Sequence, residues 1–308
     1  MPSKSASVSS KVNKVSIHTW QSKKAHGEPI TMMTGYDFPT ATALDRSGID
    51  GILVGDSLGM VVLGYDNTLP VTMQDMLHHC RAVARGASRA LLVGDLPFMS
   101  YQASVSEAVR NAGRLLQKGG MDAVKLEGGR ERASAVRAIV SAGIPVMGHI
   151  GLTPQSVHQL GGWKMQGKSA VAARRLLEDA LILEDAGCFS IVLEAIPAEL
   201  GQLISGRLVI PTISVGAGIG CDGQLLVAHD VLGLFDRFTP HFAKKYADLF
   251  SQMQHAFSEF IVDVKERRFP APEHSTSMDA QEYRDLVREI KMLEAELESE
   301  GNLSERLQ

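Results

Sequence analysis

Three acidic residues, Asp56, Asp95 and Glu127, each stand at the end of a short apolar run that is rich in β-forming residues. Such runs predict buried strands that end in polar loops. If the strands are parallel, their carboxyl ends meet at one edge, and the three carboxylates would crowd around one point. Carboxylates at close range raise each other's pKa, so we expect a cation among them.

The chemistry of these three side chains indicates which metal they would bind. Oxygen ligands favour Mg²⁺, which keeps open positions for water or substrate oxygens, and disfavour zinc, which usually takes His or Cys. The alternative is three acids at the rim of the fold that form unrelated salt bridges. Residue spacing alone leaves both interpretations open.

Lys125 lies two residues before Glu127, so both side chains point to the same face of one strand. In a barrel that face is the interior, where an unpaired lysine is costly. We therefore expect Lys125 to anchor an anionic substrate. A structural ion pair with Glu127 is the alternative.

Two further polar residues end apolar runs later in the chain. His149 could donate a hydrogen bond to a substrate oxygen, or be satisfied by a backbone carbonyl. Glu194 is surrounded by Leu193, Ala195 and Ile196, and apolar surroundings raise the pKa of a carboxylate and suit a general base. A rim carboxylate paired with an arginine is the alternative for Glu194.

These residues need a scaffold that gathers strand ends, and the hydrophobic pattern predicts one. The expected strands are Ile30–Thr34, Gly51–Val54, Leu91–Gly94, a segment from Ala123 to Glu127, Pro145–Gly148, Ser190–Leu193, Thr212–Val215 and Leu225–Ala228. Eight strands separated by helical segments favour an α/β fold, a (β/α)₈ TIM barrel with an N-terminal helix and a C-terminal helical extension. A doubly wound open sheet is the rival architecture.

Local signals mark the starts of helices and two long loops. Asp37 is an expected N-cap, and Thr72-x-x-Asp75 and Ser104-x-x-Glu107 read as capping boxes. The loops over residues 55–71 and 151–169 are long and rich in glycine, which is typical of functional or mobile loops. Gly216-Ala217-Gly218 resembles a phosphate-binding turn, although such glycine turns are common.

The chain is expected to have three parts. Residues 1–15 are rich in Ser and Lys and are expected to be disordered; residues 16–270 form the catalytic barrel; residues 271–308 form a linker and helical tail. Helices are expected over residues 242–267 and 280–298. The first residues favour a cytoplasmic protein, with an organelle-targeting segment as the alternative.

Composition excludes several classes of function. The 308-residue chain has a formal net charge of −4, which provides no basic face for nucleic acid and no reason to expect a membrane surface. No apolar run approaches the roughly 20 residues that span a bilayer. The three cysteines are too few and too scattered for a disulfide framework or a zinc knuckle. We therefore expect neither nucleic acid nor a membrane as a partner.

Longer motifs resemble those of the ketopantoate hydroxymethyltransferase family, over about Ser16 to His274. The matching stretches are Thr34-Gly35-Tyr36-Asp37, residues 53–60 (Leu-Val-Gly-Asp-Ser-Leu-Gly-Met), Leu69-Pro70-Val71-Thr72, residues 95–99 (Asp-Leu-Pro-Phe-Met), residues 124–129 (Val-Lys-Leu-Glu-Gly-Gly), residues 148–156 (Gly-His-Ile-Gly-Leu-Thr-Pro-Gln-Ser), Val192-Leu193-Glu194, Gly216-Ala217-Gly218 and Asp222-Gly223-Gln224.

The resemblance implies a Mg²⁺-dependent enzyme that moves a one-carbon unit from 5,10-methylenetetrahydrofolate to 3-methyl-2-oxobutanoate, in the first step of pantothenate synthesis. It implies decamers built from two pentameric rings. By motif match, Asp56, Asp95 and Glu127 would surround the metal that the oxo acid chelates. Ser57 and Lys125 would bind the substrate carboxylate with His149 nearby, and Glu194 would be the base that removes the C3 proton.

Two other functions remain open from the sequence. One is another Mg²⁺-dependent barrel enzyme, a lyase or phosphonomutase acting on a 2-oxo acid or phosphoenolpyruvate, although no cysteine here ends a strand. The other is an inactive barrel kept as an assembly scaffold, which is hard to reconcile with the presence of every expected polar residue.

Overall fold

Eight parallel strands form a closed barrel in which each strand pairs with the next in sequence and β8 pairs with β1. The computed structural model describes residues 13–299. The strands are β1 (Ile30–Thr34), β2 (Gly51–Val54), β3 (Leu91–Asp95), β4 (Ala123–Glu127), β5 (Val146–Gly151), β6 (Ser190–Glu194), β7 (Thr212–Val215) and β8 (Gly223–Leu226). The closed order confirms the predicted barrel and excludes the open sheet.

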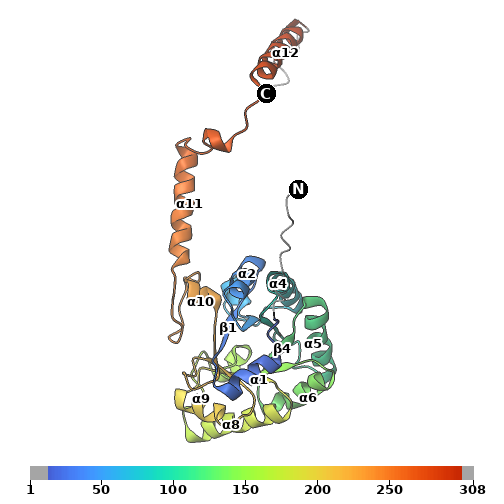
Figure 1. The fold of residues 1–308 in the computed structure, drawn as a ribbon, viewed down its shortest axis with the longest axis vertical. Helices are drawn as coiled ribbons and strands as arrows, with labels where there is room; N and C mark the ends of the chain where they lie inside the picture. The colour runs from blue at the N-terminus through green and yellow to red at the C-terminus, as the bar shows by residue number, and fades with distance from the viewer. Residues whose placement is uncertain (1–12, 300–308) are drawn as a thin grey trace, which may run out of the picture. The chain divides into compact units, whose positions relative to one another are not determined.

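Helices connect the strands and surround the barrel (Figure 1). They are α1 (Ile17–His26), α2 (Phe38–Arg46), α3 (Leu58–Val61), α4 (Met73–Gly86), α5 (Val105–Gly119), α6 (Ala133–Ser141), α7 (Val157–Leu160), α8 (Ala170–Asp185), α9 (Ala198–Ser205) and α10 (Ala228–Leu232). The two loops predicted to be long hold the short helices α3 and α7.

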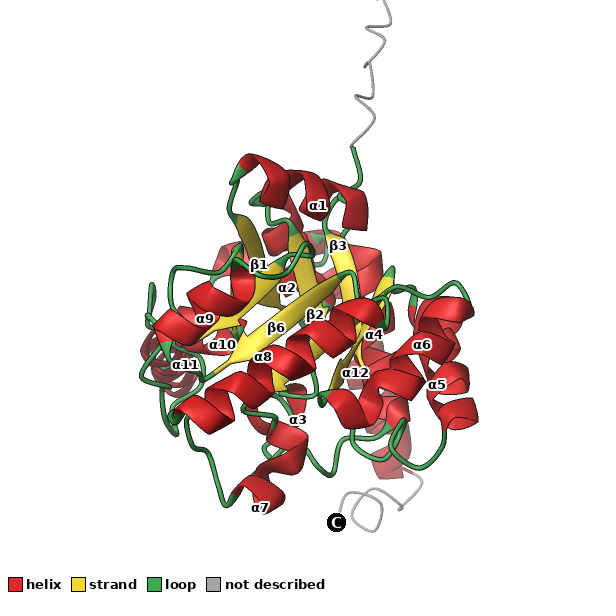
Figure 2. Ribbon diagram, turned by 90° about the horizontal axis from the view of Figure 1, so that it is seen from below, coloured by secondary structure: helices red, strands yellow, loops and turns green. Residues whose placement is uncertain are grey.

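Apolar side chains form one cluster inside the barrel and a larger one between the strands and the helices. Trp20 of α1 is fully buried in the inner cluster, with its ring 6.0 Å from that of Phe189. It lies close to Gly51, the first residue of β2, so α1 closes the amino-terminal end of the barrel. Figure 2 shows α1 at one end of the strands and α3 and α7 at the other. The carboxyl-terminal end is therefore the open one.

Strand register aligns the polar residues at this open end. Asp95 of β3 pairs with Lys125 of β4, and Glu127 of β4 pairs with His149 of β5. Because side chains alternate along a strand, Lys125 and Glu127 share a face. Both are buried, which agrees with the predicted interior position.

The predicted helix starts are present, with one difference. Thr72 and Asp75 form a complete capping box at α4. Ser104 accepts a hydrogen bond from the backbone N–H of Glu107, but the reciprocal bond is missing. Asp37 caps α2 through the N–H of Thr40, at 2.7 Å. Asp37 therefore serves the helix rather than the open end of the barrel.

The eighth strand was predicted two residues too late, at Leu225–Ala228. Gly223 pairs with Ile30 of β1 and with β7, and a Cβ on this residue would lie 2.6 Å from the carbonyl oxygen of Ile30. Glycine therefore permits the close approach that closes the barrel. Ala228 instead begins α10, where its N–H donates to Thr34 Oγ1 at 3.0 Å.

The segment predicted to be disordered, residues 1–15, extends too far along the chain, because its last two residues are ordered against the barrel. The Val15 N–H donates to the carbonyl of Arg89 at 2.7 Å, and Lys14 Nζ lies 2.8 Å from Asp122 Oδ2. Both residues thus contact the barrel. Residues 1–12, to which the rest of that prediction applies, lie outside the described residues.

The chain divides into two compact units, Met1–Leu249 and Phe250–Gln308. The second unit holds α11 (Leu249–Lys265), apart from its first residue, and α12 (Ala280–Ser299). The helix predicted from residue 242 thus begins later, because Phe242 lines a cavity of the barrel instead. The predicted domain boundary at residue 270 stays a prediction. Between residues 13 and 299, no helix combines the length and apolar character needed to cross a membrane.

Candidate active site

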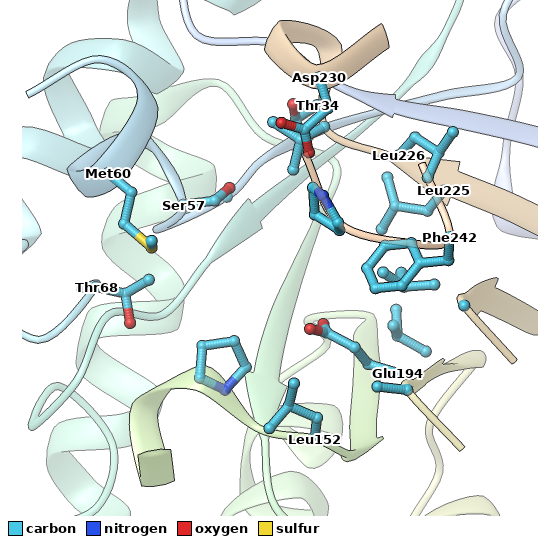
Figure 3. A pocket seen from close by; sticks show the side chains of 18 of the residues that line it. Thr34, Ser57, Met60, Thr68, Leu152, Glu194, Leu225, Leu226, Asp230 and Phe242 are labelled. Carbon is cyan, nitrogen blue, oxygen red and sulfur yellow. The ribbon is translucent and has the colours of Figure 1, made fainter. Parts of the chain in front are cut away.

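A cavity of about 470 Å³ opens among the carboxyl-terminal ends of the strands. It lies within the range of about 300–1,000 Å³ that is typical of small-molecule sites. The predicted site residues all line it: Asp56, Ser57, Asp95, Lys125, Glu127, His149 and Glu194. Figure 3 shows Ser57 and Glu194 among the side chains that border this space. The structure therefore brings the predicted set together, while the role of each member stays a prediction.

Lys125 is buried among three polar groups. Its Nζ lies 2.9 Å from Asp95 Oδ1 and 3.8 Å from Glu127 Oε1. The same nitrogen is 3.2 Å from His149 Nδ1. Burial alone would lower the pKa of Lys125, but the charges of Asp95 and Glu127 outweigh it and raise that pKa above its ordinary value. Lys125 is therefore a cation whose nearest carboxylate is Asp95, not the Glu127 suggested by sequence spacing.

The three carboxylates differ in their electrostatic surroundings. Burial, and then the charges of Asp95 and Glu127, raise the pKa of Asp56 well above its ordinary value. Burial also raises the pKa of Asp95, although Lys125 opposes the shift. Burial would raise the pKa of Glu127 too, but the hydrogen bond with His149 and the charge of Lys125 lower it. Among the described residues, Asp56 is therefore the carboxylate without an ion pair, whereas Asp95 pairs with Lys125, and Glu127 lies near both Lys125 and His149.

Two residues that the sequence analysis did not single out hold these carboxylates in place. The side-chain amide of Gln155 donates to Asp56 Oδ2 at 2.9 Å and to the Leu96 carbonyl at 3.0 Å. The Gln155 backbone N–H donates to Glu127 Oε2 at 2.9 Å. Tyr101 donates from its hydroxyl to Gln155 Oε1 at 2.7 Å. Gln155 thus fixes Asp56 and Glu127 relative to each other; the only sequence signal was its place in the motif after His149.

Ser57 lies in the loop after β2, at the cavity wall. Its hydroxyl does not cap α3, and its Oγ lies 2.8 Å from the hydroxyl of Tyr36. Tyr36 is fully buried, and burial raises the pKa of its phenol, which stays neutral. A hydroxyl can both donate and accept, so Ser57 retains hydrogen-bonding capacity for a ligand.

His149 connects the buried cluster to Glu194. Its Nε2 lies 3.2 Å from Glu194 Oε2, and its Nδ1 lies 3.5 Å from Glu127 Oε1. Burial and the charge of Lys125 oppose protonation, but Glu127 and Glu194 outweigh them and raise the pKa of His149 to about 9. The partner of Glu194 is therefore this histidine and not the arginine that the sequence left as the alternative. The role of Glu194 as a base stays a prediction.

Gly151 permits the approach of β6 to β5 at Glu194. It pairs with Glu194 in the sheet and has a φ of 97°, in the region that favours glycine. A Cβ at this position would overlap the carbonyl oxygen of Glu194. The glycine two residues after His149 therefore helps to place Glu194 beside the imidazole.

The glycine turn after β7 does not have the features of a phosphate site. The Ala217 N–H donates to Ser214 Oγ at 3.0 Å and is not free for a ligand. Gly216 lines the cavity with the ring of Phe242 packed against it. This turn therefore contributes to the shape of the cavity wall.

The donor set of the cluster suits a hard divalent cation. Asp56 forms no ion pair among the described residues, Asp95 pairs with Lys125, and the pKa of each carboxylate is raised. Mg²⁺ is often bound by one or two carboxylates together with substrate oxygens, so this pair fits the ion. In the part of the chain that the structure describes, no three His, Cys, Asp or Glu side chains converge as a ready metal site. All three metal ligands stay predictions, and the oxygens of Glu127, the third of them, are shared with Gln155, Lys125 and His149.

Comparison with known proteins gives a consistent family match. The sequence profile described as ketopantoate hydroxymethyltransferase matches residues 14–272. A relative from Syntrophus aciditrophicus, a 3-methyl-2-oxobutanoate hydroxymethyltransferase, is 58% identical over 269 residues, which cover 87% of this chain and 99% of that protein. Proteins of the same name from Oleidesulfovibrio alaskensis and Carboxydothermus hydrogenoformans are 59% and 54% identical, covering 83% and 87% of this chain and 88% and 97% of theirs.

Solved structures show likeness in fold. A phosphonopyruvate hydrolase has a TM-score of 0.55 at 12% identity, covering 92% of this chain and 98% of the other. An oxaloacetate acetylhydrolase has the same score and identity, covering 94% and 99%. At such low identity these similarities concern the barrel alone.

Proposed function

The chain belongs to the ketopantoate hydroxymethyltransferase family, and from this premise we propose that it transfers a hydroxymethyl group from 5,10-methylenetetrahydrofolate to 3-methyl-2-oxobutanoate. The product would be 2-dehydropantoate, in the first step of pantothenate synthesis. The observation that carries the proposal is one cavity lined by a candidate base, Glu194, which lies beside His149, and by a buried cation, Lys125, with the carboxylates Asp56 and Asp95. Removing a proton next to a keto group needs both a base and positive charge.

The chain's own cations would bind the oxo acid. Its carboxylate would lie near Lys125 and accept a hydrogen bond from Ser57, whose hydroxyl is oriented by Tyr36. Lys125 is buried, and its charge is worth more to a ligand there than in water. His149 would contribute a second positive charge, because its pKa of about 9 keeps it protonated near neutral pH.

A divalent metal fits the same place. Asp56 and Asp95 would hold Mg²⁺, with Glu127 contributing from its position between Gln155 and His149. When bound, the ion would stabilise negative charge that develops on the keto oxygen of the oxo acid. Gln155 would keep Asp56 oriented toward that position through the bond from its side-chain amide.

Glu194 would act as the base. It would take the proton from C3 of the oxo acid, and C3 would form a bond to the methylene carbon as one of the two carbon–nitrogen bonds of that carbon breaks. Water would then replace the second carbon–nitrogen bond, so that the methylene carbon remains on the product as hydroxymethyl. The two freed folate nitrogens would take the proton from Glu194 and a proton from the water. His149 would hold the Glu194 carboxylate in place during the proton transfer, through its Nε2.

Exchange of the C3 proton tests this proposal. Wild-type protein with Mg²⁺ is expected to exchange deuterium at C3 of the oxo acid, as measured by NMR. Glu194→Gln is expected to slow exchange by about 10²–10⁴-fold, while binding of Mn²⁺, followed by electron paramagnetic resonance, changes little. Glu199→Gln, an exposed glutamate on α9, is the matched control. Exchange near the wild-type rate in Glu194→Gln would remove Glu194 as the base.

A lyase or mutase acting on a 2-oxo acid or phosphoenolpyruvate is the alternative activity. The solved structures with the same barrel include such enzymes by name, but they share only the fold. None of the three cysteines lines the cavity, so no thiol is placed to take part. Product formation that requires the folate donor would separate the two activities.

Assembly and location are further parts of the proposal. A decamer is expected from the family resemblance, and the mass of the native protein in solution would test it. A cytoplasmic location also stays a prediction, to be checked by microscopy of the tagged full-length chain.

A further inference from the structure

Asp230 is a buried carboxylate in the cavity that lacks a partner. The residue lies in the first turn of α10, is 6% exposed and lines the cavity. Its side chain makes no hydrogen bond or ion pair with the residues described. Figure 3 shows its carboxylate beside Thr34, directed toward the cavity. A buried carboxylate without a partner is costly, so we expect it to serve a ligand.

The charge of Asp230 indicates which substrate it would contact. Burial raises its pKa to about 6, which leaves it mainly ionised at neutral pH. An ionised carboxylate repels the carboxylate of the oxo acid, for which Lys125 already offers positive charge. Asp230 therefore suits a ligand that presents hydrogen-bond donors.

The wall near Asp230 is apolar and aromatic. Phe235 and Phe238 pack edge to face with ring centroids 5.5 Å apart. The other apolar side chains of this part of the lining are Leu225, Leu226, Val227 and Phe242, several of which are visible in Figure 3. Thr34 and His241 are further polar residues of the lining. Largely apolar walls with a small number of polar groups are typical of small-molecule sites, and aromatic side chains can stack on a flat ring.

We propose that Asp230 binds the 2-amino-4-oxopteridine ring of the folate donor through the N3–H and the 2-amino group. These two donors lie side by side on one edge of the ring and match the two oxygens of a carboxylate, which favours a paired, charge-assisted contact. The apolar wall receives the faces of the ring. This inference rests on the proposed function, because it assigns the subsite of the one-carbon donor within the same cavity.

A purely structural role for Asp230 explains less. An acid in the first turn interacts favourably with the helix dipole. However, α10 has only five residues, and Asp230 accepts no hydrogen bond from its amides. A helix-capping role also gives no reason for the carboxylate to border the cavity.

Substitution of Asp230 in the full-length protein tests the contact. Asp230→Asn presents an amide donor to the pteridine donors, so the Kd of tetrahydrofolate should rise about 10- to 100-fold. The Kd is measured by calorimetry with Mg²⁺ and the oxo acid present. The KM of the oxo acid should change by less than about threefold, because this substrate would bind at Lys125 and Ser57 and not at Asp230. Asp236→Asn, an exposed aspartate in the segment after α10, is the matched control and should bind as wild type does.

An altered ligand gives an independent test on the wild-type chain. A tetrahydrofolate whose 2-amino group is replaced by methyl should bind wild type about 10- to 100-fold more weakly than tetrahydrofolate, and Asp230→Asn should distinguish the two ligands far less. Equal affinity of wild type for both ligands overturns the inference, even if Asp230→Asn fails to fold. Tetrahydrofolate binding as tight in Asp230→Asn as in wild type also overturns it, as does an equal loss of both substrates.

Failure of the proposed function gives a different result. Wild-type protein would then bind no tetrahydrofolate, or would show no Mg²⁺-dependent exchange at C3. If wild type binds tetrahydrofolate and exchanges the proton, while Asp230 has no influence on folate affinity, only the pteridine assignment fails.

Discussion

The imidazole Nε2 of His149 lies 3.2 Å from the carboxylate Oε2 of Glu194, across the pairing of β5 with β6. The opposite ring nitrogen faces Lys125 at 3.2 Å and Glu127 at 3.5 Å. The raised pKa of His149, about 9, keeps the ring protonated near neutral pH, and a protonated imidazole carries a proton on Nε2, on the side of Glu194. The histidine therefore links the candidate base to the buried cluster.

Replacing His149 should impair the base without removing it. His149→Asn takes away the partner that orients Glu194, so the rate of C3 deuterium exchange should fall about 100-fold, as expected when a catalytic group is misplaced. Exchange is followed by NMR at saturating oxo acid. His78→Asn, an exposed histidine on α4, should exchange at the wild-type rate. A His149→Asn protein that folds and exchanges normally would show that Glu194 needs no such support.

Gly151 should be sensitive to an added methyl group. Gly151→Ala would overlap the carbonyl of Glu194 and strain a backbone at φ 97°, so we expect a loss of about 1–3 kcal/mol in the free energy of unfolding, with slower exchange. Gly143→Ala is the control: this glycine has a φ of 83° but nothing near its Cβ position. The two variants are compared by urea denaturation and by exchange. Equal effects would mean that backbone strain alone, and not contact with Glu194, decides the outcome.

Gln155 should control metal affinity. Gln155→Met removes the side-chain bond to Asp56 Oδ2 while keeping a similar shape, and partners of metal ligands typically contribute about 10- to 100-fold in affinity. Weaker binding of Mn²⁺ of that size is expected by electron paramagnetic resonance. Gln74→Met, at an exposed position of α4, serves as the control. Unchanged Mn²⁺ affinity in Gln155→Met would show that Asp56 is positioned without it.

Strand periodicity was sufficient to predict the barrel, since seven of the eight expected strands overlap closely with the observed β1 to β7. It also placed Asp56, Asp95 and Glu127 at strand ends. All strands of a parallel barrel run in the same direction, so an acid that follows a buried strand lies at the carboxyl-terminal end of the barrel. The eighth strand was displaced because its first residue, Gly223, lacks the side chain that marks a strand, and its pairing with Ile30 is set by close approach across the barrel.

Contacts between distant parts of the chain were not predictable from spacing. Asp95 is the main partner of Lys125 because two strands pair in one register, whereas the sequence showed only the nearby Glu127. Gln155 and Tyr101 meet across 54 residues, and neither carries the charge that draws attention in a sequence. Asp230 was missed because its importance comes from burial without a partner, which only the folded chain shows.

The pH dependence of stability should reveal the cost of Asp230. Its pKa is raised from 3.8 to about 6, mainly by burial, so the folded state holds the proton more tightly than the unfolded state does. Ionised Asp230 therefore destabilises the native protein above pH 6, and protonation relieves this cost as the pH falls toward 4. Asp230→Asn is neutral at every pH and should exceed wild type in free energy of unfolding by about 1–3 kcal/mol above pH 7. That advantage should shrink between pH 6 and pH 4, as followed by urea denaturation at several pH values. Asp236→Asn should show no such trend, and an advantage of Asp230→Asn that is the same at pH 4 and pH 8 would contradict the assigned cause.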